Sequence, residues 1–234
     1  MILILHDWCS SVNRFVKIRN ELIDSGHRVH IMPFPGMGLE PAIWERDILE
    51  HYAGSVACYL RHNNVTCIMA HGMGCNVVLR ALQLLCTTNK VWLGKLILVS
   101  PLYGGIRRTS CLYMFRHIIE FFWMEILGSY AYAKRFCGYF LSDELMMSDL
   151  RDADTKVAMQ SLKEIASDGY IADANTGRTF IVCGLRDKLV RKKLIREMSQ
   201  SMRAEETTWL NCGHYPMVEC NSEFMAIVRR VLDA

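Results

Sequence analysis

The sequence lacks the features that mark membrane-spanning, nucleic-acid-binding and secreted proteins. No apolar run approaches the ~20 residues of a membrane-spanning helix, and the richest apolar patch, Phe121 to Met124, lies between Glu120 and Glu125. No arginine-rich or lysine-rich run occurs, and the net charge is only +3, so we expect no nucleic-acid partner. The first residues are too few and too uncharged to form a signal peptide. We therefore expect a cytoplasmic protein that does not enter a membrane.

The cysteines lack the spacing of a metal site or a redox motif. The sequence has ten cysteines, which are scattered, and no C-x-x-C pair. No Cys/His spacing matches a known metal site. Scattered cysteines inside predicted strands and helices are typical of buried thiols in a reducing compartment. The sequence therefore predicts free cysteines, no metal and no cofactor.

Short apolar strands alternate with amphipathic helices along most of the chain. Continuous apolar runs of this length suit parallel strands that are covered on both faces, and the alternation is typical of βαβ units. We therefore predict an α/β fold with a mostly parallel, doubly wound sheet. The predicted strands are 2–5, 29–32, 65–69, 95–100, 179–183 and 207–210, and apolar residues at helical spacing predict helices near 15–23, 44–60, 73–86, 192–202 and 222–232.

The alternation stops between residues 102 and 177. This stretch is helical by composition and is rich in aromatic residues and methionine. A helical block between two strands of one sheet is expected to cover the carboxyl edge of that sheet, where open α/β sheets bind ligands. The sequence thus predicts a core formed by 1–101 and 178–234, with a helical cap at 102–177.

The most informative stretch is the corner that follows the third predicted strand. It reads Ala70-His71-Gly72-Met73-Gly74. A strand, a tight small-residue corner and a helix form the nucleophile elbow, G-x-S-x-G, in which a strained turn presents a serine. Small residues stand at both ends of this corner, but Gly72 occupies the nucleophile position.

Three other strand ends carry residues that suit the same chemistry. Asp187 follows the first strand after the cap, where an acid can orient an imidazole and stabilise its cation. His214 follows the last strand and is the predicted general base. The loop after the first strand carries Trp8, and the backbone N–H groups of Trp8 and Met73 are the expected oxyanion-hole donors.

These motifs resemble the α/β-hydrolases over essentially the whole chain. Asp187 matches the G-x-x-D acid of that family, residues 213–219 match its G-H-x-x-x-x-E segment, and residues 35–38 match its P-G-x-G loop. Within the family, the size, the Trp8 loop and the cap are similar to the carboxylesterases that cleave the methyl ester of pimeloyl-acyl-carrier protein in biotin synthesis. The resemblance implies a serine carboxylesterase or thioesterase with a small acyl ester or thioester as substrate and an acyl carrier protein as partner.

Two residues depart from the family pattern: Asp7 replaces the usual glycine of the oxyanion loop, and Gly72 replaces the serine. Without a serine Oγ there is no acyl-enzyme. Three explanations stay open: a serine esterase in which glycine was substituted in the laboratory to trap a ligand, a non-catalytic ligand-binding relative, and a lyase or cyclase in which His214 and Asp187 move protons. Cys9, Ser10, Ser11 and Cys75 are poorly placed to act as substitute nucleophiles.

The predicted cap contains two groups of candidate substrate-binding residues. Phe121, Phe122 and Trp123 either line an acyl pocket or pack the cap onto the sheet. Arg107, Arg108 and Arg116 lie in a basic half of the cap. They either attract an acidic carrier protein or form an ordinary solvated helix face.

Overall fold

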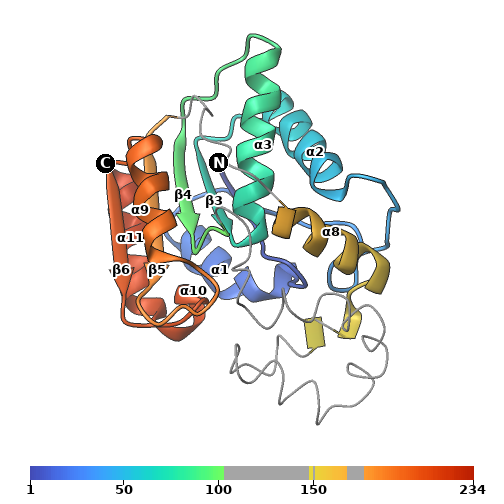
Figure 1. Cartoon of the computed structure of the whole chain (residues 1–234). Coiled ribbons are helices and arrows are strands. Elements are labelled where there is room, and N and C mark those ends of the chain that lie inside the picture. The colour runs from blue at the N-terminus through green and yellow to red at the C-terminus, as the bar shows by residue number, and fades with distance from the viewer. Residues whose placement is uncertain (103–147, 150, 168–176) are drawn as a thin grey trace.

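The residues that the structure describes form a six-stranded sheet in which every neighbouring pair of strands is parallel (Figure 1). The computed structural model describes residues 1–102, 148–149, 151–167 and 177–234. The order of strands is β2-β1-β3-β4-β5-β6. The strands are β1 (Ile2–Leu5), β2 (Val29–Met32), β3 (Cys67–His71), β4 (Lys95–Val99), β5 (Thr179–Gly184) and β6 (Glu206–Leu210).

The central strands are buried on both faces, as their continuous apolar sequences predict. Every residue of β1, β3 and β5 is buried, whereas the edge strands β2 and β6 are mostly half-buried. The predicted doubly wound α/β sheet is therefore confirmed. The third strand begins at Cys67 and ends at His71, two residues later than predicted, so the corner starts directly at Gly72.

The helices cover the sheet and connect its strands. Helices α2 and α3 pack against one another, and α8 lies beside α2 (Figure 1). The elements are η1 (Val12–Phe15), α1 (Val16–Asp24), α2 (Ile48–His62), α3 (Met73–Thr87), α8 (Thr155–Ser167), α9 (Lys192–Ser201), α10 (Pro216–Glu219) and α11 (Asn221–Asp233). Among the helices that the structure describes, none is both long and apolar enough to cross a membrane.

The start of the second helix differs most from the sequence prediction. The apolar spacing places Trp44 at the start of the second helix, but α2 begins at Ile48 and Trp44 is 56% exposed. The carboxylate of Glu164, on α8, accepts hydrogen bonds from the backbone N–H groups of Ile48 and Leu49. Because these are orphan donors at a helix start, a residue distant in the sequence caps this helix.

The described part of the predicted cap is joined to the core near the carboxyl edge of the sheet. Asp154 caps α8 by accepting from the N–H groups of Lys156 and Val157. The indole Nε1 of Trp8 donates to the Ala158 carbonyl, 2.9 Å away. Helix α8 therefore lies directly over the loop that follows β1. The predicted pocket residues Phe121, Phe122, Trp123, Arg107, Arg108 and Arg116 lie outside the described residues.

Candidate active site

The corner after β3 has the backbone conformation of a strained elbow. Gly72 links β3 to α3 with φ 51° and ψ −115°, a region that side-chain-bearing residues rarely adopt. A Cβ at Gly74 would lie 2.8 Å from the carbonyl oxygens of Leu5 and His6. Glycine at this second position therefore lets the start of α3 approach the end of β1. Gly72 adopts this backbone conformation without the strain of ~1–3 kcal/mol that a residue with a side chain would have there.

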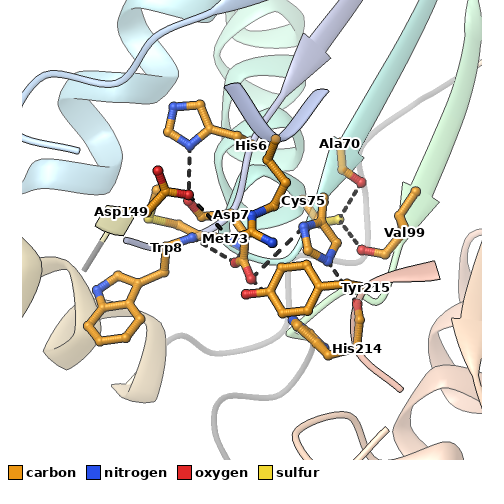
Figure 2. A network of polar contacts seen from close by, with 12 residues as sticks. His6, Asp7, Trp8, Ala70, Met73, Cys75, Val99, Asp149, His214 and Tyr215 are labelled. Atoms are coloured by element: carbon orange, nitrogen blue, oxygen red, sulfur yellow. Dashed lines mark hydrogen bonds and ion pairs between the residues drawn. The ribbon is translucent and has the colours of Figure 1, made fainter. Parts of the chain in front are cut away.

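The carboxylate of Asp7 lies against two backbone N–H donors beside the elbow (Figure 2). Its Oδ1 accepts hydrogen bonds from the backbone N–H of Met73 at 2.6 Å and from that of Trp8 at 2.7 Å. These are the two donors that the sequence predicts for an oxyanion hole. A Cβ built on Gly72 would overlap the Asp7 carboxylate. Asp7 thus occupies both the space of a nucleophile side chain and the donors of the hole.

His214 is held by the carboxylate of Asp187 on one side. The Nδ1 of His214 lies 2.7 Å from Asp187 Oδ2. The other carboxylate oxygen of Asp187 accepts from the N–H groups of Leu189 and Val190. Since a carboxylate only accepts at neutral pH, His214 Nδ1 carries a proton, and Nε2 faces the elbow.

Glu219, at the end of the G-H-x-x-x-x-E segment, supports the loop that carries His214. Its two carboxylate oxygens accept from the N–H of Gly213 at 2.7 Å and from that of Tyr215 at 3.2 Å. Because these N–H groups flank His214, the glutamate holds the backbone on both sides of the imidazole.

On its other side, His214 contacts Asp7. His214 Nε2 lies 3.2 Å from Asp7 Oδ2. Burial alone would lower the pKa of His214, but the charges of Asp187 and Asp7 and their hydrogen bonds raise it to about 10. Burial likewise opposes ionisation of Asp7, but the imidazoles of His71 and His214 and the Met73 N–H hold the pKa of Asp7 well below its usual value. The resting site is therefore an imidazolium between two carboxylates.

Two further buried histidines border this cluster, and the sequence analysis did not single them out. His6 is neutral: Nδ1 donates to the Asp7 carbonyl at 3.0 Å, and Nε2 accepts from the N–H of Phe34 at 3.3 Å. His71 Nε2 donates to the His214 carbonyl at 2.9 Å, while its Nδ1 makes no hydrogen bond and lies 4.0 Å from Asp7 Oδ2. Burial lowers the pKa of each of these imidazoles to about 4.

Cys75, one of the substitute nucleophiles considered from the sequence, makes hydrogen bonds away from His214. Cys75 Sγ donates to the carbonyls of Ala70 and Val99, and burial raises the pKa of its thiol well above the usual value. Such a thiol is inert as a nucleophile. None of the eight cysteines in the described ranges forms a disulfide bond.

The joint placement of Asp7 and Gly72 was the main feature that sequence reasoning missed. Each departure from the family pattern is visible in the sequence, but each was considered separately. The Asp7 carboxylate can fill the space left by the absent side chain of Gly72 only because β1 and β3 are neighbouring strands. In this pairing, Leu5 lies opposite Ala70. That adjacency is the signal that links the two departures.

A parallel sheet with an elbow after its third strand, an acid after its fifth and a histidine after its sixth is the α/β-hydrolase arrangement. Residues 2–227 match the alpha/beta hydrolase family. The chain therefore belongs to the α/β-hydrolase family. Among curated proteins, no sequence matches it.

Many solved structures share this fold, and three of them illustrate the range. An N-formylmaleamic acid deformylase from Pseudomonas putida has 16% identity and a TM-score of 0.75, over 97% of this chain and 90% of that one. An esterase from Exiguobacterium antarcticum has 20% identity and a TM-score of 0.74, over 98% and 91%. An enol-lactonase from Burkholderia xenovorans has 15% identity and a TM-score of 0.71, over 100% and 91%. Identities this low establish the shared fold and not a shared substrate.

Proposed function

We propose that this protein is a hydrolase in which the carboxylate of Asp7 replaces the missing serine as the nucleophile. The observation that carries the proposal is the position of that carboxylate. Oδ1 rests on the N–H groups of Trp8 and Met73, and Oδ2 faces His214 Nε2. Carboxylates serve as covalent nucleophiles in other enzymes. Asp7 comes from the loop after β1, so the nucleophile is supplied by a different strand end from that of a serine elbow.

In the first step, Asp7 Oδ2 attacks a saturated carbon that bears a leaving group. The new C–O bond forms as the bond to the leaving group breaks, and the leaving group takes the electron pair. For an epoxide, the Nε2 proton of His214 passes to the ring oxygen that leaves; a halide leaves as the anion, and the proton of His214 is released to solvent. The product is an alkyl ester of Asp7 beside a neutral His214. Because the ester carries no charge, one of the two anions that raise the pKa of His214 has disappeared.

In the second step, neutral His214 acts as a general base toward water. The resulting hydroxide attacks Cγ of Asp7, and the negative charge develops on Oδ1. That oxygen already lies at hydrogen-bond distance from the N–H groups of Trp8 and Met73, which stabilise the tetrahedral intermediate. Collapse expels the product alkoxide, which takes the proton from His214. The carboxylic acid left on Asp7 then gives its proton to His214 Nε2, which restores the Asp7 carboxylate and the imidazolium.

The filled hole argues against the acyl-enzyme route. With Asp7 Oδ1 on both donors, a substrate carbonyl oxygen has no place there, and Gly72 offers no Oγ. The proposal therefore favours alkyl electrophiles, such as epoxides or alkyl halides, over acyl esters and thioesters. The esterase, lactonase and deformylase named among the structural neighbours act on bonds next to a carbonyl, and an acyl-carrier-protein methyl ester stays a prediction of the sequence resemblance alone.

The geometry also bears on a laboratory Ser-to-Gly replacement. Such a change alters only position 72 and gives no reason for a carboxylate at position 7. In this structure, a serine at 72 and the present Asp7 conformer occupy the same space. We therefore favour a site in which both residues function together.

Turnover in H₂¹⁸O tests the proposal. During multiple turnovers of an epoxide or haloalkane panel, solvent ¹⁸O should enter the Asp7 side chain and be found in the peptide that contains it. With a haloalkane, whose leaving group needs no proton, His214→Gln should accumulate a covalent adduct on Asp7, seen as an increase in intact mass, while the exposed His62→Gln should behave as the parent protein. Turnover without label in Asp7 would instead indicate a proton-transfer reaction by His214 and Asp7, and a protein that binds these compounds without turnover would indicate a non-catalytic site.

A further inference from the structure

We infer that Asp7, His71 and His214 form a binding site for one divalent first-row transition-metal ion. The donor atoms are Asp7 Oδ2, His71 Nδ1 and His214 Nε2, which all lie within 4.8 Å of one another. Two imidazoles and one carboxylate suit ions such as Zn²⁺, Co²⁺ and Fe²⁺. This inference does not rest on the proposed nucleophile, although an ion on Asp7 Oδ2 and an alkyl group on the same oxygen exclude one another.

The unpartnered nitrogen of His71 is the first observation behind this site. His71 is completely buried, and its Nε2–H donates to the His214 carbonyl. The neutral ring therefore carries a lone pair on Nδ1, which has no hydrogen bond and faces Asp7 Oδ2 at 4.0 Å. Two buried lone pairs that face one another are unfavourable unless a cation lies between them. A metal ion bound to both atoms satisfies them.

The contacts behind the three ligands are the second observation. His214 Nδ1 is bonded to Asp187 and His71 Nε2 to a backbone carbonyl, while Asp7 Oδ1 accepts from the N–H groups of Trp8 and Met73. Metal-ligating imidazoles almost always donate their second N–H to a carboxylate or carbonyl, and ligating carboxylates are hydrogen-bonded in turn. Each ligand here already has such a partner.

The distances require only a small adjustment. Bonds of 2.0–2.1 Å in a tetrahedral site place neighbouring donors ~3.3 Å apart. Asp7 Oδ2 and His214 Nε2 are 3.2 Å apart and Asp7 Oδ2 and His71 Nδ1 are 4.0 Å apart. No pair of the three donors is more than 4.8 Å apart, so the His71 ring would move inward on binding. The ion displaces the Nε2 proton of His214, which is released to solvent. Three protein ligands leave a fourth position for water or for an oxygen atom of a bound molecule.

The sequence alone predicts no metal because the spacing of these ligands has no motif. His71 and His214 are separated by 143 residues, and Asp7 and His214 by 207. Each ligand follows or ends a different strand, and only the strand order brings them together. The Cys/His spacing rules apply to ligands on one local segment.

Binding of Co²⁺ and Zn²⁺ tests the inference. Protein treated with a chelator and dialysed should bind one Co²⁺ with visible absorption bands of low-coordinate cobalt, and Zn²⁺ should displace it. The isosteric Asp7→Asn and the ligand deletion His71→Gln should each weaken binding by at least tenfold. Asp187→Asn keeps all three ligands and should weaken binding by roughly 10–100-fold. Circular dichroism and the melting temperature show whether each variant is folded.

A matched control removes the competing surface site. Cys58 and His62 lie one helical turn apart on α2, with Sγ 3.8 Å from Nδ1, and such a pair binds metals adventitiously. Cys58→Ser/His62→Gln should leave the cobalt spectrum unchanged. Stoichiometric binding that survives Asp7→Asn and His71→Gln but is lost in Cys58→Ser/His62→Gln, or the absence of micromolar binding by the folded parent protein, would overturn the inference.

Discussion

The Asp7 carboxylate lies where a side chain at Gly72 would have to begin. Asp7 Oδ1 also accepts from the N–H of the residue after Gly72, at 2.6 Å. The two positions are therefore coupled: the carboxylate fits because glycine has no Cβ, and the donors of the elbow are satisfied because the carboxylate is present.

Gly72→Ala should destabilise the protein more than a substitution at another glycine with positive φ. Gly72 has φ 51° and meets Asp7, whereas Gly26 has φ 86° and open space around it. Gly26→Ala should lose ~1–2 kcal/mol for its backbone conformation, and Gly72→Ala roughly 3 kcal/mol or more. Denaturant unfolding measures both. Asp7→Gly should recover part of the Gly72→Ala loss, and additive effects of the two changes would contradict the coupling.

Serine at position 72 should restore ester hydrolysis only when Asp7 is also removed. Gly72→Ser alone should stay inactive on p-nitrophenyl esters and unreactive toward a fluorophosphonate probe, because Asp7 fills the oxyanion hole. Asp7→Gly/Gly72→Ser frees both donors and should gain at least ~10²-fold over Gly72→Ser. Adding His214→Gln should abolish the gain. Activity in Gly72→Ser alone would instead support a serine esterase in which only the serine had been replaced.

Breaking the buried ion pair between Arg14 and Asp149 should lower the free energy of unfolding more than breaking an ion pair with shorter hydrogen bonds on the surface. Arg14 Nη2 lies 3.3 Å from Asp149 Oδ2, with side chains 1% and 5% exposed. Arg14→Met leaves a buried carboxylate and should lose about 3–5 kcal/mol, while Arg14→Met/Asp149→Leu should recover most of it.

The control for this prediction is the exposed Arg178–Glu205 pair. Its two hydrogen bonds are 2.6 and 2.7 Å long, yet Arg178→Met should change the free energy of unfolding by no more than ~1 kcal/mol. If both arginine variants lose the same stability, burial is not what makes the Arg14 pair important.

The metal-free protein should lose stability as the pH falls from about 6.5 to about 4. The folded pKa of His6 and of His71 is about 4, below the ordinary 6.5. Between these pH values the unfolded chain therefore binds protons that the folded protein does not bind. Above pH 6.5, each of the two pKa shifts stabilises the folded protein by roughly 3 kcal/mol relative to its stability at low pH. Melting temperatures from pH 8 to 4, measured with a chelator, should fall steadily, and His6→Gln should flatten the curve.

The opposite slope is expected at alkaline pH. The pKa of His214 is raised to about 10, so its ion pairs contribute fully below pH 6.5 and are lost as the pH rises through about 10. His214→Gln should remove this alkaline loss, while the part of the acid-side loss that comes from His6 should persist. A flat profile on both sides would contradict the charge states assigned to the cluster.

Most of the fold was predictable because its signals are local. Short, mostly apolar runs marked the strands, and Ile2–Leu5 and Val29–Met32 form strands at the predicted residues. The predicted start of the second helix was wrong because Glu164, which is far away in the sequence, caps the helix at Ile48. Trp44 fits the apolar spacing but lies before that cap and faces solvent.

The sequence by itself determined the parallel α/β fold and the positions of Gly72, Asp187 and His214 at strand ends, because periodicity and short motifs depend on neighbouring residues. Only the tertiary structure decided what surrounds Gly72. The pairing of β1 with β3 brings Asp7 into the space of the absent side chain, and the pairing of β5 with β6 brings Asp187 and His214 together beside it. Asp7 contacts Met73, which is 66 positions away in the sequence, and His214, which is 207 positions away. Such contacts depend on strand order, which no local pattern specifies.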